Sequence, residues 1–213
     1  EVSINYFLDL VLKKVSKSQM SERAEIRLIE ELKNKAIDIV EDEIKRRKTS
    51  SPISVEKMGQ KKFSLSSGLE IELVAKADRI DLSNENKIIL LDYKSSLPRK
   101  TDFNLNMPQL DLEALIAKYG GFQGVAETTI SEVGVIILSS KVDELRREVN
   151  NPYLDGVEKN FIKIIEEVYS GEWGYSSKIA GTSPYEGNYD HLARYGEWSI
   201  SDEPMKQKLK EKE

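Results

Sequence analysis

At residues 88–94 the chain reads IILLDYK, and most of what the sequence implies about structure depends on this stretch. Its continuous apolar run is typical of a strand that is buried on both faces of a sheet. An acid and a lysine at the end of such a strand are costly unless they are paired or functional. Because Asp92 and Lys94 are two residues apart, a strand directs their side chains to one face, while Tyr93 points away.

A second strand is predicted just before this one. Residues 69–82 alternate between apolar and polar side chains, and residues 83–86 form a cluster of turn-forming residues. If residue 82 pairs with residue 88, the two strands form a hairpin in which Asp78 lies directly opposite Asp92 on the same face. A shorter loop would place the two acids on opposite faces, unless a bulge corrected the register. The hairpin register is therefore a testable requirement of any site built from both acids.

Two carboxylates side by side repel each other unless a cation lies between them. A divalent metal ion with oxygen ligands meets this need, and Lys94 would lie next to it. The alternative is a structural ion pair between Lys94 and one acid, but the second acid across the hairpin favours the metal site. The chain has no cysteine and one histidine, so any metal would be bound by carboxylate and carbonyl oxygens, which suits Mg²⁺ or Mn²⁺.

The rest of the pattern predicts an α/β fold with a short mixed central sheet flanked by helices. Apolar residues at helical spacing predict helices over 2–17 and, after the N-cap Ser21, up to about residue 48. A further strand is predicted over residues 53–65. After a loop over 98–106, the predicted elements are a helix over 107–118, a strand over 132–138, and helices over 141–149 and 154–169.

The charge pattern leaves two interpretations open. The basic run at residues 45–48 either lies at a helix C-terminus, where cations are favoured, or contacts a DNA backbone. A net charge of −5 counts mildly against DNA binding, since DNA-binding domains usually carry a basic excess. No apolar run is long enough for a membrane span, and the start does not read as a signal peptide, so no membrane contact is expected. A cytoplasmic protein is expected, with which the absence of cysteines is compatible. The missing initial Met suggests a piece of a longer polypeptide.

Several motifs occur in an order that resembles a known family. Residues 77–81 (ADRID) and 91–96 (LDYKSS) resemble the signature of the RecB-type branch of PD-(D/E)XK nucleases. Residues 108–114 (PQLDLEA), the following GGF at 120–122 and residues 189–194 (YDHLAR) extend the likeness. Together they resemble the C-terminal nuclease domain of AddB, the partner of AddA in alphaproteobacterial AddAB helicase–nucleases. The likeness implies a restriction-endonuclease-like core and covers most of residues 53–200.

The resemblance implies a role for each site residue. Asp78 and Asp92 would bind Mg²⁺, or Mn²⁺ as a substitute, with the Tyr93 carbonyl oxygen as a third ligand. Lys94 would orient or deprotonate the attacking water and stabilise the charge on phosphorus. Gln109 would support the site from the facing helix. Arg79 and Asp81, which belong to the same motif, are expected to be structural.

The resemblance also implies an activity and a partner. The expected function is Mg²⁺-dependent hydrolysis of single-stranded DNA, delivered by an AddA-like helicase subunit during repair of double-strand breaks. The alternative is a catalytically inactive nuclease fold that serves structure and DNA binding in the complex. That alternative draws on Asn5, which stands where the family usually has a metal-binding His; its amide oxygen makes Asn5 a weaker candidate ligand.

The C-terminal segment departs from the family as well. Many AddB proteins bind an iron–sulfur cluster through four cysteines, and here Gly187 and Ala193 stand at two of those places. No such cluster is therefore expected. The predicted domains are a nuclease core over residues 1–171 and an aromatic-rich segment over 172–213 that packs on the core and frays at its end. Alternatively, some of these rings stack on DNA bases.

Overall fold

The computed structural model describes residues 2–95, 108–139 and 141–170. The chain divides into two compact units, residues 1–160 and residues 161–213. The first contains the whole sheet; of the second, residues 161–170 are described, and they form the last turns of a helix that begins at Asn151. The predicted loop over 98–106 and the aromatic-rich segment lie outside the described residues, so the packing of that segment stays a prediction.

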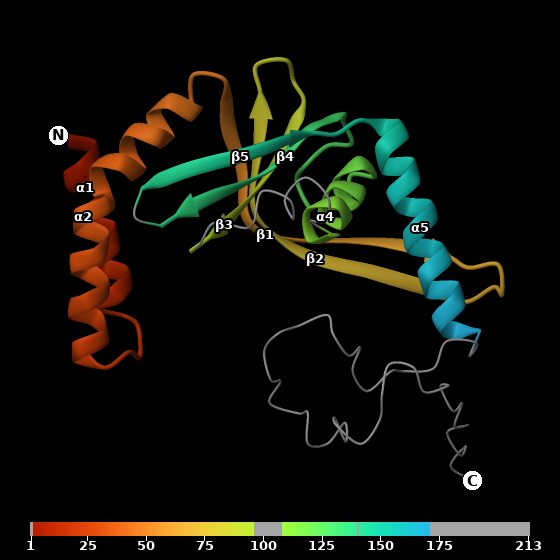
Figure 1. Ribbon diagram of the computed structural model, residues 1–213, viewed down its shortest axis with the longest axis horizontal. Coiled ribbons are helices and arrows are strands. Elements are labelled where there is room, and N and C mark those ends of the chain that lie inside the picture. Colours follow the sequence, from red (N-terminus) through yellow and green to blue (C-terminus); the bar gives the residue numbers. More distant parts are fainter. Residues whose placement is uncertain (1, 96–107, 140, 171–213) are drawn as a thin grey trace, which may run out of the picture. The chain divides into compact units, whose positions relative to one another are not determined.

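A mixed five-stranded sheet forms the centre of the first unit (Figure 1). The strands lie in chain order, with β3 and β4 parallel and the other neighbouring pairs antiparallel. The predicted α/β class with a mixed sheet is confirmed. The described elements are α1 (Val2–Val15), α2 (Glu22–Arg46), β1 (Ser50–Ser64), β2 (Glu70–Ser83), β3 (Ile88–Lys94), α4 (Pro108–Lys118), β4 (Ile130–Leu138), β5 (Val142–Glu148) and α5 (Asn151–Tyr169).

The helix predicted over residues 141–149 was wrong: this segment is the edge strand β5. It pairs antiparallel with β4, from Val142 opposite Leu138 to Glu148 opposite Glu132. Its many charged residues are also typical of a solvent-exposed helix. In the structure, however, one of them, Arg146, forms a 2.8 Å ion pair with Glu132 on the neighbouring strand. Cross-strand partners of this kind outweigh local propensity, and they are not visible in a short window of sequence.

The apolar run of β3 is buried on both faces, as predicted. Ile88 and Leu90 belong to the main core, which lies between the sheet and α4. Ile89 and Leu91 belong to a smaller cluster with Ile136 of β4. Each of these β3 residues is at most 3% exposed, so this part of β3 is closely packed on both faces.

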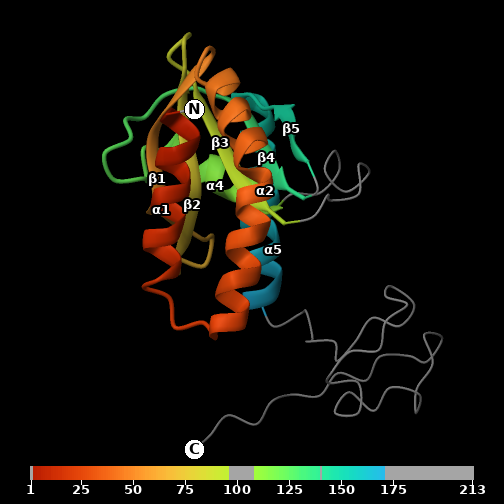
Figure 2. The ribbon, with the colours of Figure 1, turned by 90° about the vertical axis from the view of Figure 1, so that its left-hand side faces the viewer.

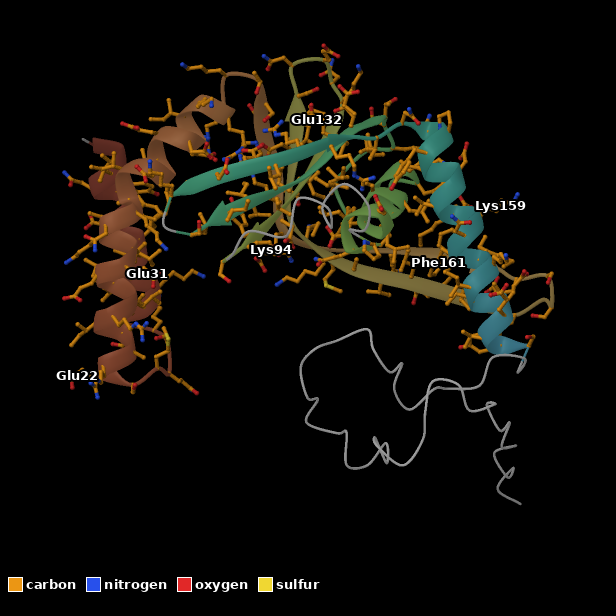
Figure 3. The ribbon with its side chains drawn as sticks, viewed as in Figure 1. Glu22, Glu31, Lys94, Glu132, Lys159 and Phe161 are labelled. Carbon is orange, nitrogen blue, oxygen red and sulfur yellow. The ribbon has the colours of Figure 1, made fainter. Side chains whose placement is uncertain are left out.

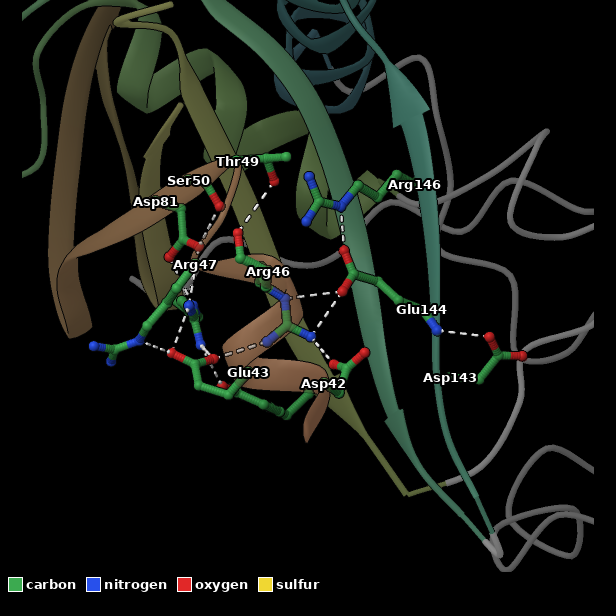
Figure 4. A network of polar contacts seen from close by, with 12 residues as sticks. Asp42, Glu43, Arg46, Arg47, Thr49, Ser50, Asp81, Asp143, Glu144 and Arg146 are labelled. Atoms are coloured by element: carbon green, nitrogen blue, oxygen red, sulfur yellow. Dashed lines mark hydrogen bonds and ion pairs between the residues drawn. The ribbon is translucent and has the colours of Figure 1, made fainter. Parts of the chain in front are cut away.

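The helices α1 and α2 run side by side (Figure 2). The C-terminal end of α2 is tied to β5 through Arg46, whose side chain is only 3% exposed (Figure 4). Arg46 Nε donates to Glu144 Oε2 at 2.9 Å, and its guanidinium also contacts Glu43 and Asp42. Burial opposes the charge of Arg46, but the bonds to Glu144 and the charge of Asp42 outweigh it and raise the pKa of the guanidinium.

These contacts bear on the two interpretations of the basic run at residues 45–48, which were a helix C-terminus and contact with a DNA backbone. α2 does end at Arg46, as the helix C-terminus interpretation requires. Arg46 is committed to contacts inside the protein, and Arg47 pairs with Glu43 at 2.6 Å. Arg46 is therefore a structural residue and is not available to a DNA backbone.

Candidate active site

The β2–β3 hairpin has the predicted register. Leu82 pairs with Ile88, and Arg79 pairs with Leu91. Continued by one residue, the same register places Asp78 opposite Asp92. The backbone N–H of Tyr93 donates to Asp78 Oδ2 at 3.0 Å, so this carboxylate lies against the end of β3. The hairpin therefore places both acids at the same end of the two paired strands, in agreement with the predicted register.

Asp92 is the most enclosed group at this end of the sheet. The residue is 4% exposed, and its Oδ2 lies 2.7 Å from Lys94 Nζ. Its Oδ1 accepts a hydrogen bond from Gln109 Nε2 at 3.1 Å. Despite the close ammonium, Oδ2 has no partner of hydrogen-bond geometry among the described residues. A buried carboxylate oxygen in that state retains capacity to bind a cation.

Lys94 lies at the C-terminal end of β3, where the core meets solvent (Figure 3). Its side chain is 37% exposed, against 5% for Asp92. The ion pair is thus buried on the acid side and open on the lysine side. Such a lysine can hold the acid while its ammonium stays within reach of water and of a bound phosphate.

The helix α4 supplies the other polar side chains of the site. Gln109 and Glu113 are four residues apart, so they lie on one face of the helix. Gln109 Nε2 donates to Glu113 Oε1 at 3.1 Å as well as to Asp92. Glu113 is 2% exposed. Burial, with the negative charges of Asp92 and Asp78, raises the pKa of Glu113 to about 7, although the bond from Gln109 and the charge of Lys94 act in the opposite direction.

Glu113 is a site residue that the sequence analysis did not single out. The quoted motif over residues 108–114 includes it, but only Gln109 was given a role. A signal was present, since Glu113 is followed by the apolar run of residues 114–117 on the buried side of the helix. An acid in such a position is uncommon unless it has a partner.

On the opposite face of the sheet, Tyr93 contacts a buried cluster of charges. Arg79 Nη1 donates to the Tyr93 hydroxyl at 3.3 Å. The same guanidinium bonds to Asp81 and to Glu43, each at 2.6 Å. Asp81 is fully buried and also accepts a hydrogen bond from Ser50. The structural role expected for Arg79 and Asp81 is confirmed, because they join the hairpin to α2.

Asn5 is not brought together with the other predicted site residues. It lies in α1, is exposed, and in the described part of the chain no hydrogen bond or ion pair joins it to Asp78, Asp92 or Lys94. Its role as a metal ligand stays a prediction.

The site residues fit a hard divalent cation. Asp78, Asp92 and the Tyr93 carbonyl offer oxygen ligands, and one buried oxygen of Asp92 lacks a hydrogen bond. Within residues 2–95, 108–139 and 141–170, no three His, Asp or Glu side chains converge closely enough to enclose a metal ion. The protein would therefore supply few ligands and water the rest, which is how Mg²⁺ is commonly held.

The fold and this site agree with a match to a family model. The model of the PD-(D/E)XK nuclease superfamily matches residues 5–179. The chain belongs to this superfamily. PD-(D/E)XK proteins are usually nucleases and typically depend on a divalent metal ion, so the superfamily assignment indicates nuclease activity. None of the helices in the described ranges of this PD-(D/E)XK chain has the length and apolarity to cross a membrane.

Similar proteins are much longer than this chain. An uncharacterized protein of Rickettsia felis is 37% identical over 90 residues, which are 41% of this chain and 10% of that protein. An uncharacterized protein of Rickettsia conorii is 37% identical over 82 residues, or 38% and 10% of the two chains. The chain thus spans about a tenth of these relatives. The crystal structure of SSO0001 aligns with a TM-score of 0.36 and 10% identity over 80% of this chain and 86% of that one, which is a weak likeness.

Proposed function

We propose that this PD-(D/E)XK domain hydrolyses phosphodiester bonds of single-stranded DNA in the presence of Mg²⁺. The observation that carries the proposal is the environment of Asp92. Its buried carboxylate lies 2.7 Å from the Lys94 ammonium, and Asp78, which accepts a hydrogen bond from the Tyr93 N–H, brings a second acid to the same end of the hairpin. A structural ion pair would need only one acid, and the second acid at this end of the hairpin favours a cation site.

Each side chain has a defined task in this proposal. Asp78, Asp92 and the Tyr93 carbonyl hold the cation. Bound Mg²⁺ supplies Lewis acidity and makes water a better nucleophile. Lys94, already near the acid, orients or deprotonates the attacking water and stabilises the negative charge that develops on the phosphate. Gln109 supports Asp92 from α4.

The wider role belongs to the same proposal. The motifs that resemble AddB suggest a nuclease domain of a helicase–nuclease that repairs double-strand breaks in the cytoplasm, with an AddA-like helicase subunit as partner. The length of the similar proteins supports a domain inside a much larger polypeptide. In that setting the helicase would supply single strands, and its own surface would supply the positive charge that this chain, at −5, lacks.

A second candidate is a nuclease fold without catalysis. It is favoured by Asn5 at the place of the usual His and by the few side chains that converge on the metal position among the described residues. In that case the domain would serve structure and DNA binding only. The two candidates differ in what happens to DNA when metal is added.

The deciding experiment is incubation of the purified chain with end-labelled single-stranded DNA. We expect degradation with Mg²⁺, none with EDTA, and none with a Lys94→Ala variant. Lys141, which lies outside the site in the loop before β5, provides a matched Lys141→Ala control that should retain full activity. If the unmutated chain and Lys94→Ala bind DNA equally and neither cleaves it, the inactive fold is the better account.

The metal site itself can be tested separately from catalysis. We expect one cation between Asp78 and Asp92, with metal–oxygen distances of roughly 2.0–2.3 Å for Mg²⁺ or Mn²⁺. A crystal soaked in Mn²⁺ would show it as an anomalous peak. Absence of a peak at saturating Mn²⁺ would contradict the site.

A further inference from the structure

The amide of Gln109 faces two carboxylates at once. Its Nε2 lies 3.1 Å from Asp92 Oδ1 and 3.1 Å from Glu113 Oε1. A primary amide nitrogen carries two N–H groups, so both are used. When both acids are ionised, the opposite orientation would point the amide oxygen at two carboxylate oxygens, and acceptors do not pair with acceptors. The amide therefore has one favourable orientation, with its oxygen directed away from both acids.

We infer that Glu113 is a positioning residue, which holds the Gln109 amide so that its oxygen remains the free acceptor at the edge of the site. Asp92 Oδ1 accepts from one N–H of the amide, and Glu113 Oε1 accepts from the same nitrogen, so Glu113 adds a second acceptor that favours the same orientation. In the described part of the chain, the one side-chain hydrogen bond of Glu113 comes from Gln109. The catalytic consequence of this inference rests on the proposed nuclease function.

The setting of Glu113 suits a residue that holds another in place. Its side chain is buried among the apolar residues of α4, and it cannot turn to solvent to find another donor. Gln109, by contrast, is exposed to solvent. An exposed glutamine would normally sample several rotamers, and two buried acceptors select one of them. Burying a carboxylate is expensive, which argues that this one has a use beyond packing.

The oriented oxygen has a specific chemical task in the proposed reaction. An amide oxygen accepts but does not take up a proton, so it can hold the attacking water by one O–H while Lys94 acts on the other. This requires the oxygen to point outward in every turnover. Glu113 would therefore affect the chemical step rather than DNA binding, although it touches neither the DNA nor the cation.

The orientation can be measured without any nuclease activity. In ¹⁵N NMR spectra of the full chain, the Gln109 side-chain amide is identified as the signal that a Gln109→Met variant lacks. We expect both of its N–H protons to be protected from exchange in the unmutated chain. Protection of only one proton, or of neither, would overturn the inference. Because this readout needs no variant of Glu113, it holds even if such a variant fails to fold.

Variants then distinguish the effect of losing the Glu113 acceptor from the effect of changed packing around α4. Glu113→Leu removes the acceptor at similar size and should abolish protection of one amide proton. Glu113→Gln keeps an acceptor oxygen and should retain part of the protection of that amide proton. The matched control is Glu158→Leu, which also removes an acidic acceptor next to α4, in this case for the Tyr119 hydroxyl at 2.7 Å. Equal protection of the Gln109 amide in Glu113→Leu and in the unmutated chain would refute the inference.

The kinetic arm uses the same variants on single-stranded DNA. If the domain is a nuclease, Glu113→Leu should lower kcat about 10- to 100-fold, as loss of an outer partner of a metal site commonly does, with KM unchanged. Glu158→Leu should leave kcat as it is. An active enzyme whose kcat survives Glu113→Leu would overturn the inference, whereas inactivity of the unmutated chain would refute only the proposed nuclease function, and the amide measurement would still decide the orientation.

Discussion

Lys94 and Asp92 form a pair whose two members differ sharply in exposure. We expect Lys94→Ala to abolish cleavage and, without metal, to lower the free energy of unfolding by about 3 kcal/mol, because the buried Asp92 carboxylate is left without its cation. The loss should shrink when Mg²⁺ is added, since the cation replaces the missing positive charge beside Asp92. Urea unfolding with and without Mg²⁺ measures both effects. A variant that no longer folds would instead favour the structural ion pair.

The raised pKa of Glu113 predicts a stability change with pH. Its pKa moves from an ordinary 4.5 to about 7 on folding, because burial and the charges of Asp92 and Asp78 favour the neutral form. Below pH 4.5 the group is protonated in both states and costs nothing. As pH rises from 4.5 to 7, the unfolded chain releases the proton first, so the folded state loses up to about 3 kcal/mol through this group.

Glu113→Gln removes that titration and provides the comparison. In the absence of metal, the difference in unfolding free energy between this variant and the unmutated chain should grow in the variant's favour from pH 5 to pH 8. Denaturant unfolding across that range measures it. A difference that stays constant with pH would show that Glu113 titrates normally.

At the scale of elements, the joint between α2 and β5 depends on Arg46. Three carboxylates converge on it, and its side chain is 3% exposed. We expect Arg46→Ala to destabilise the fold by about 3–5 kcal/mol, because it removes a buried cation on which three carboxylates converge and leaves Asp42 without an ion-pair partner in the described part of the chain. Its neighbour Arg47 also pairs with Glu43 but is 59% exposed, so Arg47→Ala should cost less than about 1 kcal/mol. If urea unfolding showed that both variants lose a similar free energy of unfolding, the special role of Arg46 in joining α2 to β5 would be contradicted.

Elements also show why the hairpin could be predicted and β5 could not. The register of β2 against β3 follows from a short turn whose residues are adjacent in sequence, and a one-residue slip would have buried the wrong side chains. The helix α4 is bounded by local signals, with Pro108 at its start and Gly120, at a φ of +63°, just after its end. β5 has no such signals, and its pairing with β4 is its main source of order.

At the scale of the whole molecule, the prediction that the segment over residues 172–213 packs on the core can be tested by removing it. We predict that truncation at Gly171 lowers the melting temperature substantially, because the aromatic side chains of this segment are expected to pack on the core. The competing expectation is a stable truncated domain that binds single-stranded DNA more weakly, since base stacking contributes on the order of 1–3 kcal/mol per base. Melting curves and DNA-binding titrations of the two chains distinguish these outcomes.

Sequence reasoning was sufficient where the deciding interactions are local. Alternation and an assumed pairing of residue 82 with residue 88 predicted Asp78, Asp92 and Lys94 at one end of a buried strand, and helical spacing predicted that Gln109 lies on a helix. These features depend on residues only a few positions apart, and the family motifs added roles to the same residues. The match to the superfamily model, over residues 5–179, agrees with the family that these motifs indicated.

Only the tertiary structure showed which distant residues form ion pairs or hydrogen bonds with the buried charged side chains. Glu144 contacts Arg46 from 98 positions away, and Arg79 contacts Glu43 from 36 positions away. Glu113 faces Asp92 only because α4 packs over the end of β3. The energy of a buried charge depends on partners brought close by the fold, so a local window cannot distinguish such a residue from one that faces water.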